Sequence, residues 1–166
     1  MNQIEPTAVE LLLVEDNPQD LELALRALRK ANLANRIHVA RDGAEALDFI
    51  FCEGTHANRR IIDVPNVILL DLNLPKIDGL DVLRRIKADP RTKTIPVVVL
   101  TSSKEQSDVI ASYQIGVNSY IVKPVNFEQF NQSVRDLGLF WLLLNQPPIL
   151  AGLPPQPAGQ ARPVGP

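Results

Sequence analysis

The sequence predicts a doubly wound α/β fold, in which five parallel strands in the order 2-1-3-4-5 form one sheet with helices on both faces. Two observations lead to this prediction. Five short apolar runs alternate along the chain with five segments of helical period. All but the second run are rich in Val, Ile and Leu without polar alternation, as is typical of parallel strands covered on both faces. Such an alternation implies right-handed crossovers.

The apolar runs locate the strands, and apolar residues at spacings of three and four locate the helices. The expected strands are Val9–Val14, Arg36–Ala40, Val67–Leu70, Val97–Leu100 and Ser119–Val122. The expected helices carry the stripes Leu21, Leu25, Leu28; Ala46, Leu47, Ile50, Phe51; Leu80, Leu83, Ile86; Val109, Ile110, Ser112, Tyr113; and Phe127, Phe130, Val134, Leu137, Trp141. The fourth stripe is the weakest of these.

Helix starts are marked by residues that suit the first turn. Pro18 is expected in the first turn of the first helix. Asp42 is expected to cap the second helix, with Glu45 three positions later, and Asn126 to cap the last. The segment 53–65 forms a long polar connection, in which Arg59 is expected to be solvated.

Length and composition fit one folded domain with two short flanking segments. The 166 residues are 45% hydrophobic, which is enough for a sizeable core. We expect an N-terminal extension over 1–8, the domain over 9–146, and a Pro/Gly-rich extended or disordered tail over 147–166. Half of the 14 prolines lie in that tail.

Charge and cysteine content exclude several classes of function. The net charge of −2 does not favour nucleic-acid binding, and no apolar stretch approaches the roughly 20 residues that span a bilayer. No secretory signal is visible at the N-terminus. The single cysteine, Cys52, cannot form an internal disulfide and is expected to be a small buried hydrophobic residue. We therefore expect a soluble cytoplasmic protein that binds neither nucleic acid nor membrane.

Three carboxylates are expected to meet at the carboxyl edge of the sheet. Glu15 and Asp16 follow the first strand, and Asp71 ends the third, its neighbour at the switch point of the sheet. Two like charges 4 Å apart repel by about 4 kcal/mol at an effective dielectric of 20. A hard cation removes this conflict, and Mg²⁺ suits a site with few carboxylates and a phosphoryl oxygen. Alternatively, Glu15 and Asp16 only cap the next helix.

Two further polar residues complete this neighbourhood. Thr101 follows the fourth strand, and Lys123 follows the fifth. A hydroxyl group and an ammonium group can each stabilise one oxygen of a phosphoryl group in transit. The Lys123–Pro124 bond is a candidate cis peptide that would direct the lysine side chain toward the carboxylates at the carboxyl edge of the sheet. Taken alone, Lys123 could also be a surface lysine before a helix.

In combination, these segments resemble the receiver domain of two-component response regulators. The resemblance covers roughly residues 9–144 and rests on six motifs that occur in order. They are Leu12–Asn17, Asp42–Leu47, Ile68–Pro75, Asp78–Gly79, Val99–Ser102 and Tyr120–Pro124. The resemblance implies a phosphoacceptor signalling protein that is not an enzyme in the usual sense.

The resemblance also implies a role for each site residue. Asp71 would accept a phosphoryl group from a phosphohistidine of a partner histidine kinase. Asp16 would bind Mg²⁺ directly, Glu15 largely through water, and Asn73 through its backbone carbonyl. The remaining roles are the following: Lys123 and Thr101 bind the phosphoryl group, Tyr120 is the switch aromatic residue, and Asn73 and Ser103 tune hydrolysis of the acyl phosphate.

The long connection after Phe51 and the apolar end of the last helix are similar to single-domain regulators of bacterial phytochrome kinases. Leu139, Phe140 and Leu143 fall partly outside the stripe that one helix can bury on its own sheet. We therefore expect a homodimer through this helix. Alternatively, the tail folds back and covers the patch with Ile149, Leu150 and Leu153.

Three other functions remain to be weighed. A Mg²⁺-dependent phosphatase of the haloacid-dehalogenase type also uses a strand-end aspartate, but it carries a second acid two residues later, where this chain has Asn73. An interaction module that is never phosphorylated would have no need of the clustered charges. A mononucleotide-binding protein would require a glycine-rich phosphate loop, and no such motif is present.

Overall fold

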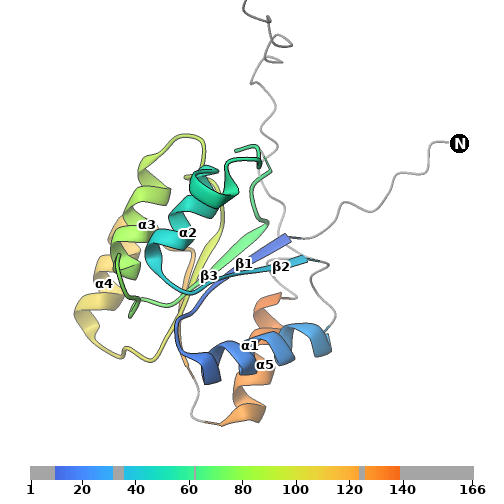
Figure 1. The fold of residues 1–166 in the computed structure, drawn as a ribbon. Coiled ribbons are helices and arrows are strands. Elements are labelled where there is room, and N and C mark those ends of the chain that lie inside the picture. The colour runs from blue at the N-terminus through green and yellow to red at the C-terminus, as the bar shows by residue number, and fades with distance from the viewer. Residues whose placement is uncertain (1–9, 32–35, 62, 124–125, 139–166) are drawn as a thin grey trace, which may run out of the picture.

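The computed structural model describes residues 10–31, 36–61, 63–123 and 126–138, and these residues form the predicted doubly wound fold (Figure 1). Five parallel strands pair in the order β2-β1-β3-β4-β5, as predicted. Their bounds are Glu10–Val14 for β1, Arg36–Ala40 for β2, Val67–Leu70 for β3, Val97–Thr101 for β4 and Ser119–Val122 for β5. The fourth strand is one residue longer than predicted, because Thr101 still pairs with Val122.

Helices cover both faces of the sheet. They are α1 (Pro18–Ala31), α2 (Gly43–Phe51), α3 (Gly79–Ala88), α4 (Gln106–Ile115) and α5 (Phe127–Gly138), with a short 3-10 helix η1 (Gly54–His56) after α2. Figure 1 shows α1 and α5 side by side on one face, and α2 and α3 on the other. No helix within the described ranges is both long enough and apolar enough to cross a membrane.

The core lies in two layers, one on each side of the sheet. In β1, Leu12 and Val14 belong to the layer under α2 and α3, whereas Leu11 and Leu13 belong to the layer under α1. Successive side chains of a strand point to opposite faces, so a strand covered on both faces must be apolar at every position. This explains why β1, β3 and β4 are continuous apolar runs.

The predicted helix starts are confirmed where the structure describes them. α1 begins at Pro18, and Asn17 Oδ1 accepts hydrogen bonds from the backbone N–H groups of Gln19 and Asp20. Asp42 Oδ1 caps α2 by accepting a 2.8 Å hydrogen bond from the N–H of Glu45. Asn126 likewise accepts from the N–H of Gln129, at the start of α5.

Three smaller predictions are wrong. Two residues of the predicted α4 stripe do not face the core, because Ile110 and Tyr113 are 49% and 54% exposed, whereas Ser112 is buried and Val109 is half-buried. Arg59 is not a solvated loop charge, since its guanidinium lies 3.4 Å from the centre of the Phe49 ring. Cys52 is half-buried and ends α2 in the left-handed conformation, with φ at 57°.

Several predictions concern parts of the chain outside the described residues. These are the flanking segments 1–8 and 147–166, the Lys123–Pro124 peptide bond, and the interface residues Leu139, Phe140 and Leu143. They stay predictions.

Candidate functional site

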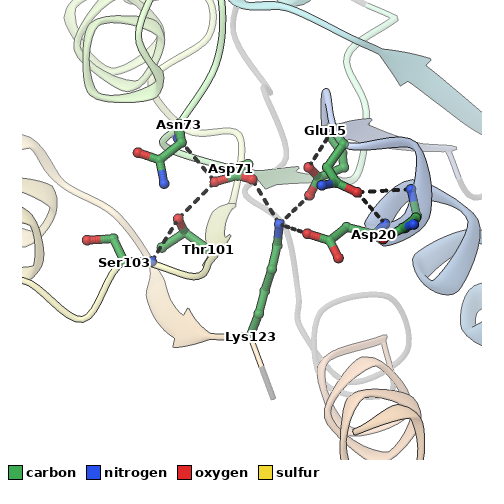
Figure 2. A network of polar contacts seen from close by, with 9 residues as sticks. Glu15, Asp20, Asp71, Asn73, Thr101, Ser103 and Lys123 are labelled. Atoms are coloured by element: carbon green, nitrogen blue, oxygen red, sulfur yellow. Dashed lines mark hydrogen bonds and ion pairs between the residues drawn. The ribbon is translucent and has the colours of Figure 1, made fainter. Parts of the chain in front are cut away.

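Backbone hydrogen bonds place the site residues at the carboxyl edge of the sheet. The N–H of Glu15 donates to Ala40 on β2, and the N–H of Asp71 donates to Val14 on β1. Similarly, the N–H of Lys123 donates to the carbonyl of Thr101 at 2.8 Å. Each residue therefore extends the ladder just beyond its strand, and the side chains start from rigid positions. Figure 2 shows them converging at one point.

Three carboxylates form a candidate metal centre. One ligand oxygen from each of Glu15, Asp16 and Asp71 lies within 4.8 Å of the others. Glu15 and Asp71 are buried, at 3% and 4% exposure, whereas Asp16 is exposed. Oxygen donors of this kind, with one side open to solvent, suit a hard divalent cation that keeps several of its waters. The three carboxylates are therefore suitable ligands for a divalent cation such as Mg²⁺.

Both oxygens of the Asp71 carboxylate accept hydrogen bonds. Oδ1 accepts from the hydroxyl of Thr101 at 2.8 Å and from the backbone N–H of Asn73 at 3.1 Å. Oδ2 accepts from the ammonium of Lys123 at 2.8 Å. The structure thus brings together Asp71, Thr101 and Lys123, which the sequence predicted as one site.

Lys123 has a third carboxylate partner that the sequence reasoning missed. Its Nζ lies 2.6 Å from Glu15 Oε2, 2.8 Å from Asp71 Oδ2 and 2.9 Å from Asp20 Oδ2. Asp20 resembles an ordinary first-turn acid that favours the helix dipole. The signal that could have revealed it is its place, because the first turn of α1 opens at the same edge of the sheet.

The buried charges shift one another's pKa. Burial raises the pKa of Glu15 to about 7, with the charge of Asp71 acting in the same direction and the Lys123 hydrogen bond opposing it. Burial alone would lower the pKa of Lys123, but its hydrogen bonds to Asp71, Glu15 and Asp20 outweigh burial and raise it. Lys123 therefore stays charged at neutral pH.

The capping alternative for Glu15 and Asp16 does not hold. Asn17 caps α1, whereas Glu15 accepts from the N–H of Asn17, before the helix, at 3.1 Å. Asp16 has no side-chain contact with the helix N–H groups among the hydrogen bonds of the described residues. Both acids are therefore available to the site.

A chain of contacts leads from Thr101 away from the carboxylates. The backbone N–H of Ser103 lies 3.4 Å from the Thr101 hydroxyl, and the Ser103 carbonyl accepts from the Tyr120 hydroxyl at 3.0 Å. The Ser103 hydroxyl donates to Asp108 at 2.6 Å. Tyr120 is partly buried against the core layer under α2 and α3. The Ser103 backbone thus connects the Thr101 hydroxyl with the Tyr120 hydroxyl.

Two glycines hold the loop after β3 close to Asp71. The N–H of Gly79 donates to the carbonyl of Leu72 at 2.9 Å, and the N–H of Gly43 donates to Pro75 at 3.3 Å. A Cβ on Gly79 would lie 2.4 Å from the carbonyl oxygen of Asp71. Glycine is therefore required at position 79 by close backbone packing beside Asp71.

This fold and this arrangement of residues define a receiver domain. A family model of the response regulator receiver domain matches residues 11–135, and the chain belongs to this family of signalling proteins. Response regulator Rcp1 of Synechocystis sp. is 43% identical over 132 residues, which are 80% of this chain and 88% of that protein.

Solved structures agree with the family assignment. The phosphorylated cyanobacterial phytochrome response regulator RcpA is 42% identical with a TM-score of 0.80, over 86% of this chain and all of that chain. The Mn²⁺-bound form of Rcp1 is 41% identical with a TM-score of 0.78, over 85% of this chain and 99% of that chain. Relatives of this chain thus occur in phosphorylated and in divalent-metal-bound states.

Proposed function

We propose that this protein is a single-domain response regulator that accepts a phosphoryl group on Asp71 from a partner histidine kinase. The observation that carries the proposal is the environment of Asp71: a buried carboxylate within 4.8 Å of two other acids and in contact with one lysine and one threonine. Such a group is positioned for phosphoryl transfer, in which the protein mainly positions groups and stabilises charge.

The phosphoryl group passes from a histidine of the kinase to Asp71. A carboxylate oxygen of Asp71 forms a bond to phosphorus, while the bond between phosphorus and the imidazole nitrogen of the donor breaks. The electron pair stays on that nitrogen. Mg²⁺ bound by Asp16, Asp71, the carbonyl of Asn73 and, through water, Glu15 would neutralise charge on the phosphoryl oxygens.

The residues of this chain supply the other contacts. Lys123 donates to a phosphoryl oxygen, and the Thr101 hydroxyl leaves Asp71 to donate to another. This movement passes through the Ser103 backbone to Tyr120, which biases an existing two-state equilibrium. Asn73 and Ser103, two residues beyond Asp71 and Thr101, set the lifetime of the acyl phosphate.

We infer that the protein is a phosphoacceptor and that it has no independent hydrolase activity. A phosphatase with an aspartate nucleophile needs a general acid two residues later. That position is Asn73, an amide that cannot supply a proton in this way. Its backbone N–H instead holds Asp71 Oδ1.

The partner is proposed to be a phytochrome histidine kinase, since RcpA is described as a phytochrome response regulator. The output then passes through protein contacts. The same proposal includes a homodimer through Leu139, Phe140 and Leu143. It also includes domain boundaries at residues 9 and 146 and a cis Lys123–Pro124 peptide bond.

Intact-protein mass after incubation with acetyl phosphate tests the proposal directly. Wild type should gain one phosphoryl group only when Mg²⁺ is present, and Asp71→Asn should gain none. Asp78→Asn is the matched control, because it makes the same change on an exposed residue of the loop after β3. A mass gain that persists in Asp71→Asn would exclude Asp71 as the acceptor.

A further inference from the structure

Lys123 has no donor left for a phosphoryl group. An ammonium group carries three N–H donors. In the structure these three are directed at Glu15, Asp20 and Asp71, at 2.6, 2.9 and 2.8 Å (Figure 2). If a phosphoryl oxygen is to accept from Lys123, one of these contacts must be given up.

The three partners differ in how easily they release the lysine. The side chains of Glu15 and Asp71 are 4% and 5% exposed, whereas that of Asp20 is 35% exposed. An unpaired buried carboxylate carries a large desolvation penalty, but an exposed one is hydrated again at little cost. Asp20 also lies outside the cluster of carboxylates that could hold the metal. As long as Asp71 is still a carboxylate, the contact with Asp20 is therefore the easiest of the three to release.

We propose that Asp20 competes with the incoming phosphoryl group for Lys123 and thereby slows phosphorylation. This inference rests on the proposed function of Asp71. When the contact with Asp20 is released, Lys123 still has its contacts with Glu15 and Asp71. Asp20 adds a contact that exists only before phosphorylation, and stabilising the ground state alone raises the barrier.

The test compares Asp20→Asn with wild type in acetyl phosphate at saturating Mg²⁺. The rate of Asp71 phosphorylation should rise roughly threefold to tenfold, the size of effect expected from one partly exposed charge contact. Beryllium fluoride, which mimics a phosphoryl group on a carboxylate, should bind tighter by a similar factor. Asp20→Ala provides a second variant, because alanine is favourable in helices.

Glu22→Gln is the matched control for charge. Glu22 is an exposed acid on the same helix and is not a partner of Lys123. Its loss should leave both measurements unchanged. An equal acceleration in Glu22→Gln and Asp20→Asn would assign the effect to the field of the helix, and it would overturn the proposal.

A double-mutant cycle with Lys123→Met tests whether Asp20 acts through the lysine. In that background Asp20→Asn should change neither the phosphorylation rate nor the beryllium fluoride affinity, which remains measurable where the rate is too low. An Asp20→Asn rate equal to or below that of wild type would overturn the inference while wild type still phosphorylates. If wild type itself gained no phosphoryl group on Asp71, the proposed function would fail first.

Discussion

The hydroxyl of Thr101 donates a 2.8 Å hydrogen bond to Oδ1 of Asp71, although the two residues are 30 positions apart. Thr101 has no exposed surface, and Asp71 is 4% exposed. The contact is therefore shielded from water, and a buried charge that loses such a donor is destabilised more than an exposed one. A phosphoryl group on Asp71 would therefore change the hydrogen bond of the Thr101 hydroxyl directly.

Thr101→Val should weaken the binding of beryllium fluoride by roughly tenfold, because valine keeps the shape of threonine and removes the donor. Thr101→Ser, which keeps the hydroxyl, should lie close to wild type. Fluorine NMR titration at fixed Mg²⁺ measures both affinities. Equal affinities for Thr101→Val and wild type would show that the hydroxyl is not a phosphoryl ligand.

Gly79→Ala should destabilise the protein and slow phosphorylation together. Its new Cβ would lie 2.4 Å from the carbonyl oxygen of Asp71 and 2.5 Å from Cα of Leu72, so the backbone beside the acceptor must shift. Overpacking of this kind costs about 1–3 kcal/mol. Urea unfolding and the phosphorylation rate are the two measurements.

Gly116→Ala is the comparison for Gly79→Ala. It adds the same methyl group, but its nearest neighbours are carbons of the flexible Lys87 side chain at 3.8 and 3.9 Å. Its cost comes from a φ of 115°, which disfavours any side chain. It should lower stability without changing the phosphorylation rate at 25 °C. A normal rate in Gly79→Ala would contradict the positional role of Gly79.

His38 should titrate below its ordinary value of 6.5, because burial lowers its pKa. Glu10, whose carboxylate lies 3.2 Å from Nε2, acts in the opposite direction, whereas Arg59, Arg36 and His56 lower the pKa further. In Glu10→Gln the pKa of His38 should therefore fall again. Proton NMR of the imidazole ring between pH 4.5 and 8 would measure the change.

The lowered pKa of His38 makes the folded protein less stable as the pH falls. Because the pKa of His38 is lower in the folded state, the unfolded chain binds the proton more tightly. The contribution of His38 to the free energy of unfolding is therefore fully present above pH 6.5. It is lost as the pH falls through the pKa of the folded state. Because the side chain is 38% exposed, the effect should be small. A pKa of His38 above 6.5 would contradict both statements.

Lys87→Met should lower the free energy of unfolding by about 1–3 kcal/mol, because backbone carbonyl groups lose a charged donor. Lys87 Nζ donates to the carbonyls of Lys93 and Ile95, and to Asn118 Oδ1, at 3.1, 2.8 and 3.3 Å. Lys93→Met is the control, since Lys93 is exposed and contributes only its backbone to this network. Equal stability of the two variants in urea would contradict this assignment.

The strands and most of the site could be predicted from the sequence because both follow from local pattern. β3 is buried on both faces, so its four residues are all apolar, and the run ends where Asp71 begins. Parallel strands place their carboxyl ends at one edge. The meeting of Glu15, Asp71 and Lys123 then follows from topology, without knowledge of any distance.

The parts that could not be predicted depend on which distant groups a long or exposed side chain meets. Arg59 lies in a polar connection, yet it stacks on Phe49 and reaches Glu10 at 2.9 Å, a residue 49 positions earlier. Ile110 and Tyr113 have the spacing of a helix stripe, but α4 leaves them exposed. Periodicity predicts which residues share a face, not what covers that face.

The sequence by itself determined the α/β class and the identity of the acidic, hydroxyl and lysine groups at the carboxyl edge. Burial on two faces leaves a continuous apolar run in each strand, and the polar site residues follow where these runs end. The tertiary structure alone decided how these groups pair. The ammonium of Lys123 is shared among Glu15, Asp71 and the unforeseen Asp20, which lies 103 positions away. Pairing depends on distances of a few Å between side chains of different elements, and a strong charge contact forms only where desolvation and geometry both permit it.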